Sequence, residues 1–469
     1  MLRCSCKSAL MAILEKVPGE IHGHISEQTD AGVGTAHMKV DIIDEMAELQ
    51  SLDKPGWIKN CLQLADHFND RIDEKYGQSS EVRLIFDQYD LPLSLKSATR
   101  VKQQGGQDPV YYRITDSTHI AKVTMKRLLS HTKTKMELTV YLAERPTCNM
   151  PNDSESARVI VAWGDECQAT HKDVTYLKSN HEEADTKMIL HALDVTADGT
   201  TELHIHSPDT DVFILALRRY PNLCENVSFV TGKGQNHRVI KLRPTVQALG
   251  PGKTASLPAL YAISGADNTG RFSGKGKLAF WKVFNNVEEI IISELEKLGT
   301  TFTPTAETIA SIETFVCQLY LPMTTFTKVK ELRWWLFKKK QAQSERLPPT
   351  QAALHEAILR AHYQLIVWNH DRDPNPELPP PESYGWERNA DEYLPVMTML
   401  PPAPEAIIQL VKCNCAKQRC SNNRCQCRIA GLKCTDICTC SDDDESCSNV
   451  EDEDDHLEQT DGDSSDEDN

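Results

Sequence analysis

The amino-acid sequence predicts an α/β fold in which a mostly parallel sheet is flanked by helices. Two observations predict it. Across residues 36–300, short runs rich in β-branched residues alternate with segments of helical period, which is the pattern of strand–helix–strand units. Acidic residues recur where several of these runs end, and a parallel sheet presents its functional side chains at the carboxyl ends of its strands. The length of 469 residues allows two to four units, and 40% hydrophobic residues suffice for a sizeable core.

The expected elements of this region follow from the alternation. The strands are the short apolar runs Lys39–Asp44, Glu81–Asp87, Leu203–Ser207 and Asn226–Thr231. The helical segments include Gly56–Asp73, Ala121–Leu129 and Glu182–Leu193. The polar stretch Arg145–Ser156 contains two prolines and is interpreted as an inserted loop, whereas residues 1–35 show no clear period and are expected to be irregular.

Composition divides the rest of the chain into four parts. They are a helical segment (301–372), a Pro-rich extended connector (373–410), a cysteine-rich module (411–449) and an acidic tail (450–469). In the first part, Leu354, Ile358 and Leu365 repeat at helical spacing. Pro349 precedes them and is well suited to the first turn of a helix.

The negative charge of the chain is concentrated at its C-terminal end. Fifteen Asp and Glu residues and no Lys or Arg lie between Ser441 and Asn469, so they account for most of the net charge of −17 and leave −2 for the other residues. Like charges at this density predict a disordered, solvated tail. The alternative is a tail that mimics DNA or binds a protein partner.

The sequence predicts neither secretion nor a membrane span. The apolar run Ala9–Leu14 is short and is followed by Glu15 and Lys16, unlike a secretory signal. No stretch reaches the roughly 18 apolar residues that a membrane span needs. We therefore expect a nuclear or cytoplasmic protein, in which thiols stay reduced and the sixteen cysteines favour metal binding over disulfides.

Carboxylates follow three of the expected strands and open one expected helix. Asp44 and Asp87 each end an apolar run. Asp209 and Asp211 follow a third run, and Glu182-Glu183-Ala184-Asp185 lies in the first turn of a helix. A single Asp after a strand is most often a turn residue or a helix cap, so the prediction depends on the whole set and its order.

Such a set of acids points to metal-ion chemistry. Carboxylates that converge on one crevice repel each other unless cations neutralise them. Mg²⁺ and Mn²⁺ prefer hard oxygen ligands, and two such ions about 4 Å apart can activate a water molecule and stabilise the leaving oxygen of a phosphodiester. The set therefore predicts a metal-dependent nuclease.

The order of these acids resembles that of the PIN-like, flap-endonuclease superfamily over about residues 40–290. That family has an Asp at an early strand end, which Asp44 resembles. A second strand ends in an Asp, as at Asp87, and a basic helix follows, to which Lys96 and Arg100 are similar.

The later acids continue the resemblance. Glu183-Ala184-Asp185 is similar to the family's Glu-x-Glu, with Asp in place of the second Glu. Asp209 and Asp211 resemble the Asp-x-Asp that follows the next strand. Gly265-Ala266-Asp267 resembles a Gly-x-Asp before a glycine-rich turn, so all seven family acids have a counterpart in this chain.

The resemblance implies a role for each of these residues. One Mg²⁺ or Mn²⁺ ion would be held by Asp44, Asp87, Glu183 and Asp185, and a second by Asp209, Asp211 and Asp267. Lys96 and Arg100 would neutralise the scissile phosphate, and water would attack it without a covalent enzyme intermediate. Asp185 is shorter than the family's Glu, which would shift the metal distances, and Glu182 is expected to compensate.

The glycine-rich stretch Ser273-Gly274-Lys275-Gly276-Lys277 follows the last of these acids. Glycines let the backbone approach a phosphate, and Lys275 and Lys277 are predicted to hold it. The family places a helix–turn–helix element for duplex binding near this position. The alternative is an ordinary glycine-rich loop.

Two histidines, His204 and His206, alternate on one face of the third expected strand. This arrangement is compatible with metal ligation. Histidines whose hydrogen bonds are satisfied within the strand are the commoner case, and this is the interpretation that the sequence favours.

Nine of the sixteen cysteines form a module with the spacing CxC-x4-C-x4-CxC-x6-C-x3-CxC-x6-C. They are Cys413, Cys415, Cys420, Cys425, Cys427, Cys434, Cys438, Cys440 and Cys447. An odd number argues against a disulfide framework, and nine thiolates fill the twelve positions of three tetrahedral zinc ions if three sulfurs bridge. The pattern resembles the tesmin-type CXC module, which binds three zincs in that manner. The match is strong through Cys440; the last gap is longer, although Cys447-Ser448-Asn449 keeps the terminal Cys-x-Asn.

The cysteine module is basic as far as Cys440. Lys417, Arg419, Arg424 and Arg428 are predicted to contact nucleic-acid phosphates. Arg424 stands where that family has its DNA-reading aromatic residue, so sequence-specific reading is not expected. The alternative is a structural zinc knot or a protein-binding module.

The order of the parts resembles that of a group of mobile-element-associated animal proteins, a resemblance that implies no activity by itself. The matching segments include Ser130–Lys135, His181–Thr186 and Pro348–Ala353. The predicted function is a divalent-metal nuclease that acts on DNA, branched or single-stranded, with a zinc module that binds nucleic acid. Two alternatives are a catalytically silent nuclease fold that binds DNA or chromatin, and a nuclease that acts on RNA.

Overall fold

The computed structural model describes residues 7–21, 38–89, 91, 93–96, 109–148, 158–338, 347–390, 392–398, 411–415, 420–421, 424–435, 437–441 and 447–449. The chain divides into two compact units. The first comprises Met1–Val329 and Ala353–Val396, and the second comprises Lys330–Ala352 and Met397–Asn469. The first unit contains the sheet, and the second contains the cysteine cluster.

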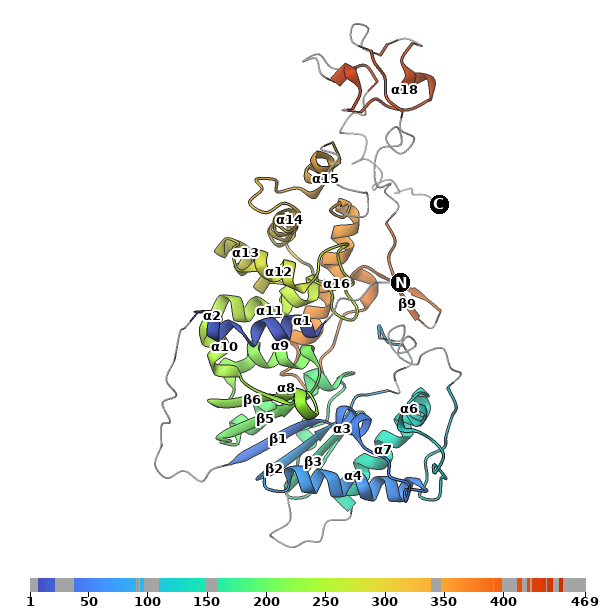
Figure 1. The fold of residues 1–469 in the computed structure, drawn as a ribbon, viewed down its shortest axis with the longest axis vertical. Coiled ribbons are helices and arrows are strands. Elements are labelled where there is room, and N and C mark those ends of the chain that lie inside the picture. Colours follow the sequence, from blue (N-terminus) through green and yellow to red (C-terminus); the bar gives the residue numbers. More distant parts are fainter. Residues whose placement is uncertain are drawn as a thin grey trace, which may run out of the picture. The chain divides into compact units, whose positions relative to one another are not determined.

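A seven-stranded sheet forms the centre of the first unit (Figure 1). The strands are β1 (Lys39–Asp44), β2 (Glu81–Ile85), β3 (Arg158–Trp163), β4 (Glu166–Ala169), β5 (Glu202–His206), β6 (Asn226–Thr231) and β7 (Arg238–Lys241). Their order is β4-β3-β2-β1-β5-β6-β7; the five inner strands are parallel, and β4 and β7 pair antiparallel at the edges. The mostly parallel sheet that the sequence predicts is therefore confirmed.

Helices cover both faces of the sheet (Figure 1). One face carries α4 (Cys61–Tyr76) and α7 (Thr132–Cys148), and the other carries α8 (Ala184–Ala197), α9 (Thr210–Arg219) and α10 (Leu242–Leu249). On the first face, Phe68 of α4 and Leu138 of α7 are buried in one core with Ile43 of β1 and Leu84 of β2. After β4 the chain crosses to the other face and adds β5 beside β1, so the topological switch point lies between β1 and β5.

A further helical layer lies beyond α9 (Figure 1). Its members are α11 (Pro251–Ile263), α12 (Lys277–Phe284), α13 (Glu289–Glu296), α14 (Ala306–Tyr320) and α16 (Gln351–Asn369). α11 packs on α9 and α13, and α13 packs on α14. α16 begins two residues after Pro349, so this proline is not in its first turn as expected.

The remaining elements are short. The described residues also form α3 (Glu45–Ser51), α6 (Met125–Leu128), α15 (Val329–Lys338), α18 (Gln426–Ile429) and the 3-10 turns η1 (Thr175–Leu177), η2 (Tyr220–Asn222), η3 (Gly234–Asn236), η5 (Pro381–Ser383) and η6 (Thr439–Ser441). The three helices expected between residues 56 and 193 are present as α4, α6 and α8, with shifted bounds.

The N-terminal segment, expected to be irregular, contains two helices. They are α1 (Ser8–Leu14) and α2 (Val17–Ile21). Leu10, Met11 and Leu14 are at most 2% exposed, because α1 packs against α9 and α12, and α2 against α10. Helices this short are marginal alone, so it is the burial of these apolar side chains that stabilises them.

Two expected loops also contain regular structure. α7 continues to Cys148, so the first residues of the stretch expected as an inserted loop are helical; residues 149–157 lie outside the described residues. The Pro-rich segment contains a hairpin of β8 (Trp386–Asn389) and β9 (Glu392–Pro395). Tyr384 is buried against Tyr363 and Ile366, and this aromatic packing anchors the segment to α16.

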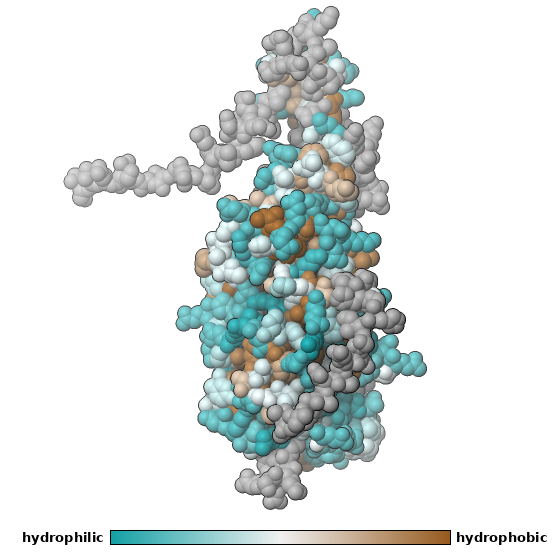
Figure 2. All heavy atoms as spheres, turned by 90° about the vertical axis from the view of Figure 1, so that its left-hand side faces the viewer, coloured by the Kyte–Doolittle hydropathy of each residue, from teal (hydrophilic) through white to brown (hydrophobic). Residues whose placement is uncertain are grey.

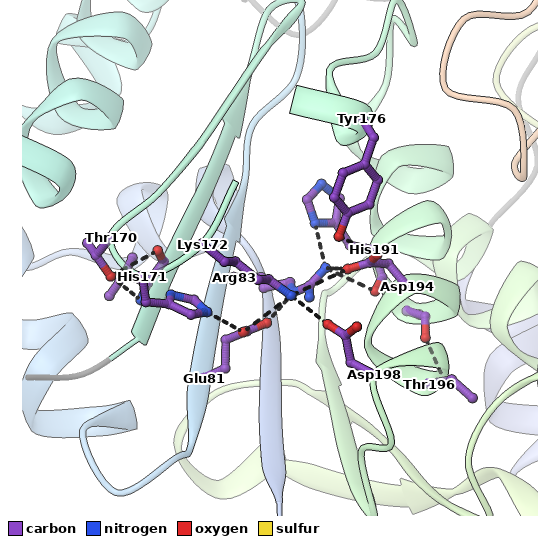
Figure 3. Close-up of polar contacts among 12 residues, drawn as sticks. Glu81, Arg83, Thr170, His171, Lys172, Tyr176, His191, Asp194, Thr196 and Asp198 are labelled. Atoms are coloured by element: carbon purple, nitrogen blue, oxygen red, sulfur yellow. Dashed lines mark hydrogen bonds and ion pairs between the residues drawn. The ribbon is translucent and has the colours of Figure 1, made fainter. Parts of the chain in front are cut away.

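A buried polar network connects β2 to α8 (Figure 3). Arg83 is fully buried, and its guanidinium pairs with Glu81 at 2.6 Å and with Asp194 at 2.7 Å. It also lies 3.2 Å from His191 Nδ1, so this nitrogen accepts and the imidazole is neutral. Burial, and then the charge of Arg83, lower the pKa of His191 well below its usual value. A buried guanidinium is tolerated only with such partners, and the network thus fixes β2 against α8.

The surface of the described residues is predominantly hydrophilic on the face shown in Figure 2, with hydrophobic residues in separate patches. Exposed large apolar side chains include Val239, Leu278 and Ile290. Within the described part of the chain, no helix is both long and apolar enough to cross a membrane.

Candidate active site and cysteine cluster

Six of the seven acids singled out by the sequence lie at strand ends and helix N-termini of the first unit, and Asp267 lies in the turn between α11 and α12. Asp44 and Asp209 are the N-cap residues of α3 and α9, and each accepts a hydrogen bond from the backbone of its helix. Glu183 holds the N-cap position of α8. Asp185 and Asp211 lie in the first turns of α8 and α9. Asp and Asn are strong N-cap formers, so helix initiation itself places these carboxylates beyond the carboxyl ends of the strands.

Six of the seven acids line one hollow with a volume of about 210 Å³. They are Asp44, Asp87, Glu183, Asp185, Asp209 and Asp267. Lys96 and Lys135 line the same hollow. The seventh acid, Asp211, is joined to the group through Lys7, whose Nζ lies 3.2 Å from Asp211 Oδ2 and 2.7 Å from Asp267 Oδ2.

Two lysine ammonium groups lie between the carboxylates. Lys7 Nζ is also 3.6 Å from Asp209. Lys96 Nζ pairs with Glu183 and lies 3.3 Å from Asp267. Burial opposes a charge on Lys7, but the neighbouring carboxylates outweigh it and raise the pKa of the amine. No local pattern in the sequence predicts the position of Lys7, because its partners are more than 200 residues away.

Hydrogen bonds orient the acids at the ends of β1 and β2. Asp44 accepts from Ala47 N at 3.2 Å and from Ser207 Oγ at 3.0 Å. Asp87 accepts from Ala184 N at 2.8 Å and from Tyr89 Oη at 2.9 Å. These contacts connect the strand ends to the start of α8 and to the residue after β5.

Burial, together with neighbouring carboxylates, raises the pKa of three of the acids. Burial, together with Asp87, raises the pKa of Asp44 to about 6. Burial and the neighbouring Glu183 raise the pKa of Asp185 well above its usual value. Burial and Asp211 raise the pKa of Asp209 as well. The negative charge of the carboxylates in the hollow therefore exceeds the positive charge of the lysines around it.

Cations and hydrogen-bond donors lower the pKa of two further acids, Asp87 and Asp211. Burial alone would raise the pKa of Asp87, but Lys135 and the Ala184 N–H outweigh it and lower the pKa. Burial is likewise outweighed at Asp211, where Lys7 and Lys96 lower the pKa. Tyr261 also donates to Asp211, at 2.6 Å.

The donor set fits divalent cations. Asp185 Oδ2 is buried and accepts no hydrogen bond. Seven carboxylates face Lys7, Lys96 and Lys135, which leaves an excess of four negative charges when all are ionised, equal to the charge of two divalent ions. Oxygen-only donors of this kind suit Mg²⁺ and Mn²⁺.

Sequence reasoning missed several residues around the hollow. Glu45 follows Asp44 directly, is fully buried, and has two oxygens without a hydrogen-bond partner. Burial and Asp44 raise its pKa well above the usual value. Lys135 of α7 lies over the ring of Tyr89 at 4.2 Å. The position of Glu45 beside a strand-ending Asp was the one local signal available for this group.

The structure corrects one predicted phosphate contact. Lys277 is 3% exposed, and its Nζ donates to Tyr261 O at 2.8 Å and to Ser264 Oγ at 2.9 Å. Burial lowers the pKa of this amine to about 7. Lys277 is therefore an internal hydrogen-bond donor, not a surface cation. Lys275 is half-buried, with Nζ 4.8 Å from the centre of the Tyr320 ring.

Glu182 does not line the carboxylate hollow with Glu183. It accepts a hydrogen bond from Ser94 and lines a neighbouring cavity of about 320 Å³. This cavity is walled by Tyr363, Trp368 and prolines of the connector. Arg100, expected beside Lys96, lies outside the described residues.

Eight of the nine module cysteines form groups that suit a metal ion. The groups are Cys413–Cys427–Cys434–Cys438, Cys413–Cys420–Cys425–Cys434 and Cys420–Cys434–Cys440–Cys447. Neighbouring sulfurs lie 3.5 Å (Cys413 to Cys420) to 3.9 Å (Cys413 to Cys434) apart. Four thiolates at about 2.3 Å from a tetrahedral zinc lie roughly 3.8 Å from each other, whereas a disulfide needs about 2.05 Å. The spacing fits zinc, with Cys413, Cys420 and Cys434 shared between groups.

The last residues of the module, Cys447 and Asn449, contact its other cysteines. Cys447 belongs to the third group despite the longer gap before it. Asn449 Nδ2 donates to Leu432 O at 2.9 Å and to Cys434 Sγ at 3.3 Å, and Asn449 O accepts from Cys434 N at 2.6 Å. The terminal Cys-x-Asn thus positions a shared sulfur.

The predicted basic face of the module is described in part. Arg424 and Arg428 are exposed. Arg428 donates to Cys420 O at 3.2 Å, so this side chain also supports the loop around a shared cysteine. Lys417 and Arg419 lie outside the described residues.

Comparison with known proteins gives a fold-level likeness only. No protein-family model and no curated protein match the chain. The chain is similar to a crystal structure of the T5 D15 protein co-crystallised with metal ions, at 14% identity over 71% of this chain and 91% of that chain, with a TM-score of 0.34. A pseudo-enzyme–product complex of the bacteriophage T5 flap endonuclease with DNA and metal ions shows 15% identity, coverage of 71% and 90%, and a TM-score of 0.35.

Proposed function

We propose that this chain is a divalent-metal-dependent nuclease that hydrolyses phosphodiester bonds of DNA. The observation that carries the proposal is the gathering of six carboxylates from five segments in one hollow, with a seventh joined through Lys7. Carboxylates at close range destabilise a fold unless cations compensate them, so a structural role alone does not account for this number of acids.

The proposed ions are two Mg²⁺ or Mn²⁺. One would be held by Asp44, Asp87, Glu183 and Asp185, and the other by Asp209, Asp211 and Asp267. When bound, ions of this kind polarise a phosphodiester and make water a better nucleophile. Lys96 lines the same hollow and supplies a fixed positive charge for a phosphate oxygen.

The chain's own hydrogen bonds supply the preorganisation that this chemistry needs. Ser207 and the Ala47 N–H hold Asp44, while Tyr89 and the Ala184 N–H hold Asp87. Carboxylates that are oriented before the ions arrive lose little freedom on binding them. DNA is preferred to RNA in this proposal, and branched or single-stranded DNA is the expected substrate.

The cysteine cluster is proposed to bind three zinc ions and to contact nucleic acid. Its sulfur spacing supports the first part, and the exposed Arg424 and Arg428 support the second. The acidic tail, which lies outside the described residues, is a candidate for a protein partner or for competition with DNA.

A second candidate function is a catalytically silent nuclease fold that binds DNA or chromatin. One observation favours it: Lys7 Nζ lies among Asp209, Asp211 and Asp267, where the second ion would bind. A lysine that stays there in the presence of Mg²⁺ would prevent the binding of that ion.

The test is cleavage of labelled single-stranded, duplex and flap DNA, and of matched RNA, in Mg²⁺ or Mn²⁺. The double variant Asp209→Asn/Asp211→Asn should lose cleavage and keep nucleic-acid binding. The matched control is Asp173→Asn/Asp198→Asn, which removes two exposed carboxylates from the same unit and should cleave like the wild type. Binding without cleavage by all three proteins would reject the enzyme and favour the silent fold.

A further inference from the structure

A second group of candidate metal ligands lies on the α4 face of the sheet, between β1 and β5. In the parallel register, Asp41 pairs with His204 and Ile43 with His206, so the acid and both histidines lie on one face. Asp41 Oδ1 is 2.6 Å from His206 Nε2 and 3.4 Å from His204 Nδ1. The three atoms lie within 4.8 Å of one another.

The outer atoms of two of these residues are held by other side chains. Asp41 Oδ2 accepts a hydrogen bond from Ser79 and lies 3.5 Å from Lys39 Nζ. His204 Nε2 lies 2.8 Å from Glu202 Oε1. Metal-ligating histidines commonly bond a carboxylate through their second nitrogen in this way, which fixes the ring and its tautomer.

We propose that Asp41, His204 and His206 bind one transition-metal ion of the zinc class. Two imidazoles and one carboxylate suit zinc, whereas Mg²⁺ prefers oxygen alone. Asp41 is 1% exposed, while the side chains of His204 and His206 are 19% and 12% exposed, so the ligand set is fixed by burial and still accessible to an ion. Three protein ligands leave a coordination position for solvent or an external ligand.

The two distances from Asp41 to the histidines require only a small adjustment. Zinc binds nitrogen and oxygen at about 2.0–2.2 Å, so two ligand atoms of a tetrahedral site lie roughly 3.4 Å apart. The atoms of Asp41 and His204 are already 3.4 Å apart. Those of Asp41 and His206, at 2.6 Å, must separate by less than about 1 Å. The ring of Tyr76 packs edge-on against His206, with centroids 5.0 Å apart, and keeps that imidazole directed at Asp41.

This site is independent of the carboxylate hollow. Asp41 precedes Asp44 by three residues along β1, which is roughly 10 Å of extended strand. Its ligands include nitrogen, and none of its three residues lines the hollow. Failure of the proposed nuclease activity would therefore leave the zinc proposal standing, and the reverse also holds.

The test is zinc stoichiometry of the full chain, measured by equilibrium dialysis against buffered Zn²⁺ and elemental analysis. Wild type should bind one more zinc per chain than His204→Gln/His206→Gln. The matched control is His119→Gln/His237→Gln, which removes two exposed histidines and should keep the wild-type number. Equal zinc content in wild type and in a folded His204→Gln/His206→Gln variant would overturn the proposal.

A second measurement does not depend on the folding of a variant. Zinc-edge X-ray absorption of the wild-type chain, loaded with Zn²⁺ in excess Mg²⁺, should show imidazole scattering in addition to the sulfur shell of the cysteine cluster. A spectrum with sulfur or oxygen neighbours and no imidazole would reject the site. In addition, Glu202→Gln should weaken zinc binding at this site by about 10-fold or more while the cysteine-bound zincs remain.

Discussion

The ammonium group of Lys7 lies 2.7 Å from Asp267 Oδ2, although 260 residues separate the two in the chain. Packing of α1 on α9 and α12 brings them together. The N-terminal segment, for which the sequence indicates no role, thereby contributes a cation to the candidate active site.

Replacing Lys7 should make the site bind metal more readily. In Lys7→Gln, the three carboxylates that face the amine lose a competing positive charge, so half-maximal cleavage should require several-fold less Mg²⁺. Cleavage of flap DNA over a Mg²⁺ titration measures this. Lys16→Gln removes an exposed lysine from the same segment and should not change the titration. A higher Mg²⁺ requirement in Lys7→Gln would show that Lys7 assists the site instead.

Replacing Glu183 should lower the cleavage rate far more than replacing the adjacent Glu182. Glu183 lines both the carboxylate hollow and the neighbouring cavity, whereas Glu182 lines only the neighbouring cavity of the two. Glu183→Gln should lower the cleavage rate by about 100-fold or more, since a lost metal ligand costs several kcal/mol of transition-state stabilisation. Glu182→Gln should stay within a few-fold of wild type. Equal losses in single-turnover assays would mean that Glu182 also serves as a ligand.

Because His191 is neutral in the folded protein, we expect the free energy of unfolding to fall as the pH is lowered. Its folded-state pKa lies below the unfolded value, so protons bind preferentially to the unfolded chain as the pH falls below about 6.5. Protonation of this one histidine in the unfolded chain should lower the free energy of unfolding by up to about 1.4 kcal/mol at about pH 5.5. The effect is absent above the unfolded pKa, because both states are then neutral.

A conservative variant isolates that effect. His191→Asn keeps an acceptor for Arg83 and removes the titrating group, so its stability should fall less between about pH 7 and pH 5.5 than that of wild type. Denaturant unfolding at both pH values gives the comparison. His237→Asn, at an exposed position, should follow wild type. Parallel pH profiles for all three proteins would contradict the assignment.

Removing zinc should unfold the cysteine cluster and spare the sheet. The core of the cluster consists almost entirely of sulfur side chains, which repel each other as thiolates without a metal. A strong chelator added to the full chain should make residues 411–449 sensitive to protease, while the far-ultraviolet circular dichroism of the first unit persists. Resistance of the cluster to protease after complete zinc removal would argue against a metal-dependent fold.

Asn449 should matter for zinc affinity without being a ligand. It donates to Cys434 Sγ, and Cys434 belongs to all three groups of four cysteines. Asn449→Ala should therefore weaken zinc retention against a competing chelator by about 10-fold. Asn414→Ala is the control, because Asn414 is exposed and its Oδ1 accepts a hydrogen bond from the Thr439 hydroxyl.

Local patterns made the sheet and most of its acids predictable. The run Lys39–Asp44 has the same bounds in the structure, because its β-branched apolar residues favour a buried strand. Asp44 and Asp87 could be placed from the sequence for the same reason, because each ends such a run. The burial of Lys277 could not be predicted from the sequence. A glycine-rich context suggests exposure, and its hydrogen-bond partner Tyr261 lies on another helix.

Tertiary contacts determined what the sequence left open. α1 depends on α9 and α12, so its seven residues show no helical signal strong enough to stand alone. The preferred interpretation of His204 and His206, as hydrogen-bonded strand residues, agrees with their contacts to Glu202 and Asp41. Their convergence on one oxygen of Asp41 required the register of β1 and β5, which no single strand specifies.

The N-cap positions of Asp44 and Asp209 have an evolutionary consequence. Asn caps a helix as well as Asp does, whereas Ala costs roughly 0.5–2 kcal/mol. An Asp→Asn replacement at either position would remove a carboxylate and leave helix initiation intact. A descendant of this chain can therefore lose the proposed catalysis in a single step that selection for stability does not oppose, and persistence of the fold among descendants would not by itself preserve the chemistry.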